Sequence, residues 1–143
     1  MNILSGNDGA NITYPVSIKA VMFLGGKIPL LLNERDEWEL PGGKLDVDES
    51  PEVCVAREVK EELSADVKVV EILDSWTYTI YKGVHVFIVT YLVEGLSGAE
   101  NSMTVSCEHK QLKMFYPDEI SSLNMPQGYK NSIFKAISTR EDP

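Results

Sequence analysis

The chain has 143 residues, of which 43% are hydrophobic, and its formal net charge is −9, from 22 acidic and 13 basic residues. This length suits one compact domain over residues 1–143 better than two. The acidic balance argues against a duplex nucleic acid partner, because phosphate backbones bind to concentrated basic surfaces. It permits a small phosphorylated substrate, provided that metal ions bridge the two sets of negative charge.

The cysteine content and the hydropathy pattern bear on location. The two cysteines, Cys54 and Cys107, make no disulfide framework and fit a reducing compartment. No apolar run approaches the length of a membrane span, and the first residues lack the basic and apolar regions of a signal peptide. We therefore expect a cytoplasmic protein with no membrane partner. The oligomeric state is left open, and a homodimer is compatible with the sequence.

The first third of the chain predicts two strands and a loop. Residues 16–24 are mostly apolar and end at Gly25-Gly26, a turn signal, before a second apolar run at 28–32. Together these runs predict a hairpin with a tight connection. A charged loop tip follows at 34–37, and then comes the segment WELPGG at 38–43.

A helix is predicted to begin just after Ser50. Ser50 suits the N-cap, Pro51 suits the first helical position, and Glu52 favours the positive end of the helix dipole. Three apolar residues then recur at helical spacing, and they are Val55, Val59 and Leu63. This stripe predicts that one face of the helix packs on a sheet.

The remainder of the chain predicts strands and a final helix. Residues 67–73, 75–81, 84–93 and 112–116 are β-rich. Pro117 opens a short helical turn, and an amphipathic C-terminal helix is predicted from the spacing of Tyr129, Ile133, Phe134 and Ile137. Strands on both sides of one helix, with a second helix last, predict an α/β fold in which a mixed sheet lies between helices.

Three glutamates crowd one face of the first predicted helix. Glu58, Glu61 and Glu62 stand at i, i+3 and i+4, a spacing at which like charges weaken a helix. An isolated run of this kind is usually a solvated face. Here a glycine turn, Pro41-Gly42-Gly43, precedes it and lets the backbone come close to the same point. A divalent cation with oxygen ligands would offset the repulsion.

This spacing resembles the Nudix box: glycine, five residues, glutamate, seven residues, Arg-Glu, an aliphatic, any residue, Glu-Glu, any residue, glycine, aliphatic. The matching residues are Gly43, Glu49, Arg57, Glu58, Val59, Glu61, Glu62 and Ala65. Ser64 replaces the second glycine. The resemblance implies the Nudix-type α/β/α sandwich and hydrolysis of a nucleoside diphosphate-linked compound, with Mg²⁺ or Mn²⁺ as the cofactor.

The resemblance also implies roles for the matching residues. Glu58 and Glu62 would be the core metal ligands, with Glu61 assisting and the carbonyl of Gly43 as a backbone ligand. The two residues that would brace the loop against the helix are Glu49 and Arg57. Arg57 would also reduce the repulsion among the glutamates.

The general base and the substrate contacts are less strongly marked. In the family the base is a box glutamate, here Glu58 or Glu61, or a glutamate from a distant loop, here Glu108. Glu108 would serve as the base or as an extra metal ligand, and is otherwise a surface acid. Arg35 and Lys44 flank the glycine turn as candidate phosphate-binding residues. No serine or cysteine has the surroundings of a nucleophile.

The favoured function is a nucleoside triphosphate pyrophosphohydrolase of the MutT type, with a small-molecule nucleotide as substrate. An ADP-ribose, nucleotide-sugar or dinucleoside polyphosphate hydrolase is the alternative, as is a non-catalytic nucleotide-binding module. Ser64 has two readings: the helix ends differently and catalysis is intact, or the chain is a weakened relative retained for binding. The complete carboxylate set favours the first reading.

Overall fold

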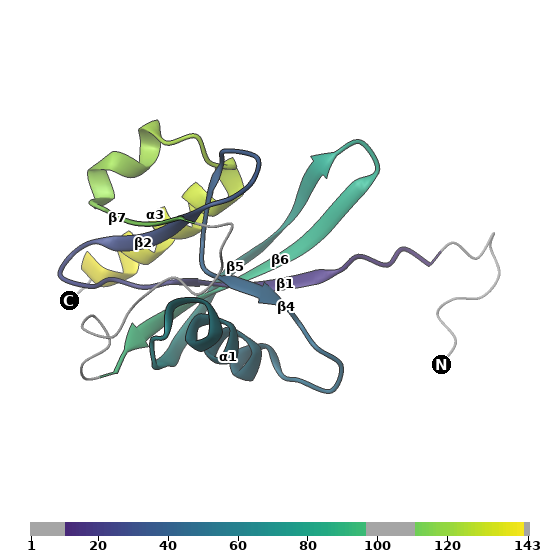
Figure 1. Ribbon diagram of the computed structural model, residues 1–143, viewed down its shortest axis with the longest axis horizontal. Coiled ribbons are helices and arrows are strands. Elements are labelled where there is room, and N and C mark those ends of the chain that lie inside the picture. The colour runs from purple at the N-terminus through teal and green to yellow at the C-terminus, as the bar shows by residue number, and fades with distance from the viewer. Residues whose placement is uncertain (1–10, 97–110, 142–143) are drawn as a thin grey trace.

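The computed structural model describes residues 11–96 and 111–141. Its helices and longer strands follow the order predicted from the sequence, and two short strands at 38–39 and 42–44 were not predicted (Figure 1). They are β1 (Val16–Val21), β2 (Ile28–Leu32), β3 (Trp38–Glu39), β4 (Gly42–Lys44), α1 (Pro51–Leu63), β5 (Val67–Tyr81), β6 (Val84–Gly95), β7 (Gln111–Phe115), the 3-10 helix η1 (Pro117–Ser122) and α3 (Gln127–Glu141).

The strands form two sheets. The larger one has the order β4-β1-β6-β5 and is mixed, because β1 pairs parallel to β6 while the other pairs are antiparallel. The smaller one has the order β3-β2-β7 and is antiparallel. The larger sheet carries β4, and through β4 it positions the glycine turn that precedes α1.

The predicted hairpin between β1 and β2 is wrong. The two strands lie in different sheets, and their connection keeps a single isolated bridge, between Leu24 and Lys27. Gly25 and Gly26 do make the turn, with φ of 59° and 81°. Because β1 is already flanked by β4 and β6, it has no free edge for β2, and β2 continues into the smaller sheet.

The strand β5 is longer than predicted. Residues 67–73 and 75–81 belong to one strand, which passes through Asp74 with register shifts on both sides of Ile72. Asp74 stays in the strand because α3 supplies partners for its carboxylate. Ser132 Oγ donates to Asp74 Oδ1 over 2.6 Å, and Lys135 Nζ lies 3.7 Å from Oδ2.

Two hydrophobic cores lie on opposite faces of the larger sheet. One core packs α1 on β1 through Ile18, Ala20 and Val59, all fully buried. The other packs α3 and the smaller sheet on the opposite face, through residues that include Val21, Ile88 and Ile133. Trp38 and Trp76 both pack against this second core. The predicted mixed sheet between helices is therefore confirmed.

The face that α3 buries differs at one position from the prediction. Tyr129 and Ile133 are buried and Ile137 is partly buried, as expected. Phe134 is 39% exposed, so its assignment to the apolar stripe is wrong. Ala136, three residues after Ile133, is fully buried and belongs to the buried face instead. Among the described residues, no helix has the length and apolar character needed to cross a membrane.

Candidate active site

Helix α1 begins and ends at defined caps. Ser50 is the N-cap, and its hydroxyl oxygen accepts a hydrogen bond from the Val53 N–H over 3.3 Å. At the other end, Ser64 is left-handed, with φ 59° and ψ 29°, and its N–H donates to the carbonyl of Lys60 over 2.9 Å. The helix therefore does not end differently: Ser64 adopts the geometry for which the box glycine is favoured.

Gly42 brings the turn against β1. It pairs with Lys19 at φ 142°, and a side chain here would collide with the carbonyl oxygen of Ile18. Its N–H donates to Glu62 Oε1 over 2.9 Å. This bond joins the last turn of α1 to the glycine turn.

Gly43 makes room for a carboxylate. It pairs with Ile18 of β1, and a Cβ added to it would overlap the carboxyl group of Glu58. Burial raises the pKa of Glu58; Glu61 and Glu62 raise it further, although Arg57 acts in the opposite direction. Two glutamates of α1, Glu58 and Glu62, thus converge on the glycine turn.

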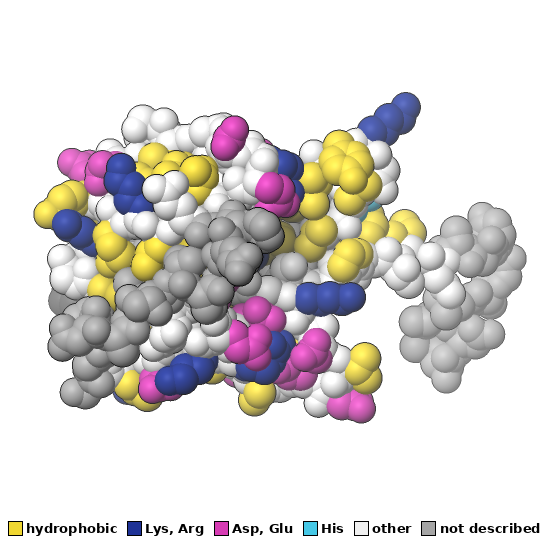
Figure 2. All heavy atoms as spheres, viewed as in Figure 1, with side chains coloured by type: hydrophobic (Ala, Val, Ile, Leu, Met, Phe, Trp, Pro, Cys, Tyr) yellow, Lys and Arg dark blue, Asp and Glu magenta, His cyan; other side chains and the backbone are white. Residues whose placement is uncertain are grey.

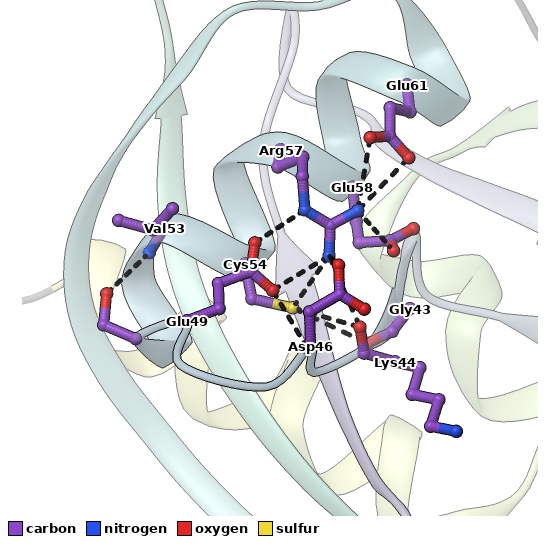
Figure 3. Close-up of polar contacts among 10 residues, drawn as sticks. Gly43, Lys44, Asp46, Glu49, Val53, Cys54, Arg57, Glu58 and Glu61 are labelled. Atoms are coloured by element: carbon purple, nitrogen blue, oxygen red, sulfur yellow. Dashed lines mark hydrogen bonds and ion pairs between the residues drawn. The ribbon is translucent and has the colours of Figure 1, made fainter.

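Arg57 lies at the centre of an acidic cluster (Figure 3). Its Nε and Nη2 donate to the two carboxylate oxygens of Glu49 over 2.6 and 2.9 Å. Its Nη1 donates to Glu58 over 3.0 Å and to Glu61 over 3.2 Å. The hydrogen bonds from Arg57 lower the pKa of Glu49 from 4.5 to about 2, and those to Glu49 raise the pKa of Arg57.

The donor set matches a hard divalent cation. Mg²⁺ and Mn²⁺ prefer oxygen ligands, which the carboxylates of Glu58, Glu61 and Glu62 and the Gly43 carbonyl provide. Within the described residues, no three acidic, histidine or cysteine side chains are already grouped around a common point. Arg57 and the Gly42 N–H hold the carboxylates instead. To bind one ion together, these carboxylates would have to turn toward a common point.

Other candidate residues lie apart from this cluster. Arg35 pairs with Glu34 over 3.1 Å and with Glu37 over 3.3 Å, in the loop before β3. The Lys44 side chain is exposed and points away from the glutamates, although its backbone is part of the turn (Figure 3). Glu108 lies outside the described residues.

Two supporting contacts were not predicted from the sequence. Asp46 lies 3.4 Å from Arg57, and its N–H donates to Glu49 over 3.1 Å, so it joins the loop to the cluster. Lys19 is buried and donates to the carbonyl of Leu40 over 3.2 Å, just before the glycine turn, with Glu39 at 4.0 Å. A charged residue within an apolar strand was the available signal for Lys19. The spacing of three residues between Asp46 and Glu49 was the signal for Asp46.

Cys54 packs beneath the cluster. It is fully buried, and its Sγ lies 3.5 Å from the carbonyl oxygen of Lys44. Burial, with the nearby Glu49 carboxylate, raises the pKa of this thiol to about 12. Cys54 therefore fills space between α1 and β4 as a protonated thiol.

Solved structures share this arrangement of two helices about a mixed sheet. One is the E. coli ORF135 protein, with a TM-score of 0.71 and 22% sequence identity over 91% of this chain and 93% of that one. Another is the MutT protein of Methanosarcina mazei Go1, with a TM-score of 0.72 and 22% identity over 91% of this chain and 96% of that one. A third is the MutT NUDIX hydrolase of Burkholderia pseudomallei, with a TM-score of 0.70 and 25% identity over 87% of this chain and 98% of that one. The chain thus has the fold of these proteins.

The sequence comparison is more specific. The model of the NUDIX domain matches residues 13–136, and the chain belongs to the Nudix family. It is 38% identical over 100 residues to a MutT-like protein of Streptomyces ambofaciens, covering 70% of this chain and 60% of the relative. It is 47% identical over 38 residues to the 8-oxo-dGTP diphosphatase of Proteus vulgaris, and this match covers 27% of this chain and 34% of the relative. The matched part is thus under two thirds of either relative's length.

Proposed function

We propose that the protein is a metal-dependent hydrolase that cleaves a phosphoanhydride in a nucleoside diphosphate-linked compound, as a nucleoside triphosphate pyrophosphohydrolase of the MutT type. The observation that carries the proposal is the convergence of Glu58 and Glu62 of α1 on the turn Gly42-Gly43. Membership of the Nudix family and the similarity to a MutT-like protein support it.

In this proposal Glu58, Glu61, Glu62 and the Gly43 carbonyl hold Mg²⁺ or Mn²⁺. The ion would offset the charge of the substrate phosphates and lower the pKa of bound water. Glu49 and Arg57 are positioning residues, because their paired hydrogen bonds fix the loop after β4 against α1. Arg57 also offsets part of the charge of Glu58 and Glu61 before an ion is bound.

The remaining roles concern the proton and the phosphates. Glu58, Glu61 or Glu108 accepts a proton from the attacking water. Arg35 and Lys44 contact substrate phosphates, for which Arg35 must exchange its pairs with Glu34 and Glu37. We also propose a cytoplasmic location, which the unpaired, buried Cys54 supports.

The test is release of phosphate or pyrophosphate with Mg²⁺ or Mn²⁺, measured over nucleoside triphosphates, ADP-ribose, nucleotide sugars and dinucleoside polyphosphates. Glu62→Gln removes a proposed ligand, and Glu52→Gln is the matched control, because Glu52 is exposed in the first turn of the same helix. We expect a preference for a nucleoside triphosphate. We also expect kcat to fall at least about 100-fold in Glu62→Gln and to stay near wild type in Glu52→Gln.

Two outcomes would count against the proposal. If Glu62→Gln retained full activity, the assignment of metal ligands to α1 would be wrong. If no substrate were cleaved with either ion, the non-catalytic nucleotide-binding module would replace the hydrolase. Direct titration with nucleotides would then measure its affinity.

A further inference from the structure

The C-terminal half of strand β5 lies at an open edge of the larger sheet. In the order β4-β1-β6-β5, β5 is the last strand, and no other described strand pairs with its outer side. From Asp74 to Thr79 its register against β6 is regular, whereas shifts interrupt the register before Asp74 and after Thr79. Bulges disfavour the addition of another strand, so the regular part, which makes up most of residues 75–81, is where β5 accepts one most readily.

The sequence of this edge has few of the features that prevent strand addition. Residues 75–81 read SWTYTIY, with no charged residue, proline or glycine. β-Branched and aromatic residues of this kind favour strands, and a long uncharged edge favours pairing with another chain. The β5–β6 hairpin also projects from the body of the molecule, so an approaching strand meets little obstruction (Figure 1).

An exposed aromatic side chain accompanies the open edge. Tyr81 at the end of β5 is 66% exposed. Figure 2 shows hydrophobic side chains gathered over the projecting hairpin. Burying such a ring stabilises an interface.

We propose that residues 75–81 pair antiparallel with the same residues of a second copy, which makes the protein a homodimer with one sheet continuous across both subunits. A chain of net charge −9 approaches its own copy with least repulsion at a segment without acidic residues, and 75–81 is such a segment. Asp74 precedes it and Lys82 follows it. Antiparallel pairing brings the exposed Lys82 of each copy toward Asp74 of the other, whose carboxylate also lies 3.7 Å from Lys135 of α3.

The test is the oligomeric state, measured by sedimentation velocity and light scattering over a range of protein concentrations. Thr77→Lys places like charges near the two-fold axis, and Thr77 is exposed. The matched control is Gln111→Lys, which adds the same charge at an exposed position of β7, the edge of the other sheet. We expect a wild-type dimer, roughly tenfold weaker association in Thr77→Lys, and no change in Gln111→Lys.

A wild-type protein that is monomeric at every concentration would overturn the proposal. So would a dimer that Gln111→Lys weakens and Thr77→Lys leaves intact. If Thr77→Lys fails to fold by circular dichroism, a variant with both Thr77→Cys and Thr79→Cys gives the decision. In the proposed register residue 77 of each copy lies opposite residue 79 of the other, so oxidation should cross-link the two copies. Gln111→Cys should give no cross-link. A cross-link at residue 111 without one in β5 would place the interface elsewhere.

Discussion

Ser64 holds a backbone geometry that glycine adopts more easily. Its φ of 59° lies in the left-handed region, where a side chain is unfavourable by roughly 1–2 kcal/mol. The sequence predicted this position correctly as a helix end, because the box pattern places glycine there. It did not predict that serine would keep the same geometry, since that depends on how Ala65 and the following strand pack.

The prediction at this position is a gain in stability. Ser64→Gly should raise the free energy of unfolding by about 1 kcal/mol, because glycine removes the strain at positive φ. Urea denaturation with an unchanged slope would measure the gain. Ser64→Ala is the control and should give none, because alanine keeps a Cβ. A loss of stability in Ser64→Gly would show that contacts of the serine hydroxyl outweigh the strain.

The neighbouring glycines show the limit of local reasoning. The turn signal covers Gly42 and Gly43 alike, although the box resemblance singles out Gly43. In the structure Gly42 is required by the carbonyl of Ile18 and Gly43 by the carboxylate of Glu58. Each requirement comes from a residue distant in the chain, so the turn was predictable but the separate purpose of each glycine was not.

At the scale of elements, the loop after β4 is tied to α1 by Arg57 and Glu49. The resemblance predicted this pair from its spacing, and the structure shows two parallel hydrogen bonds with the geometry of a guanidinium on a carboxylate. Arg57 also reaches Glu58 and Glu61 at once. One side chain therefore links the loop to the acidic face of the helix.

This link predicts a pH dependence of stability. The pKa of Glu49 is about 2 in the folded protein and near 4.5 when unfolded, so its ionised form favours folding. The contribution is complete above pH 4.5 and is lost as the pH falls from about 4.5 to about 2. The difference in unfolding free energy between wild type and Glu49→Gln should shrink over this range. A difference independent of pH would show that the pair does not shift this pKa.

The pairing of strands was the least predictable feature at this scale. The strand segments were mostly found from their composition, but β1 and β2 were assigned to each other because a glycine turn joins them. Adjacent strands often pair, but here β1 pairs with β4 and with β6, which lies far along the chain. Composition does not encode that choice, because the apolar residues of β1 suit either partner.

At the scale of the whole molecule, a chain of charge −9 with carboxylates converging on one turn should respond to divalent ions. Saturating Mg²⁺ is expected to raise the melting temperature by several degrees, since a ligand at 100 times its Kd adds about 2.7 kcal/mol to stability. Sodium chloride at equal ionic strength is the control for screening.

The glutamate variants separate specific binding from screening in the same melting experiment. Glu62→Gln should lose most of the Mg²⁺ effect, and Glu52→Gln should keep it. An equal rise with sodium chloride, or an equal rise in Glu62→Gln, would mean that the ion acts only by screening. This readout does not depend on catalysis, so it tests the proposed ligands even if no substrate is found.

The division of the core between the two faces of the sheet has a consequence for optical measurements. The chain has two tryptophans, and both Trp38 and Trp76 pack on the face covered by α3. Intrinsic fluorescence therefore reports on that face and is nearly insensitive to a local opening of α1. Far-ultraviolet circular dichroism detects both helices. Coincident transitions by the two methods would show that both cores unfold as one cooperative unit, and an earlier dichroism change would reveal α1 detaching first.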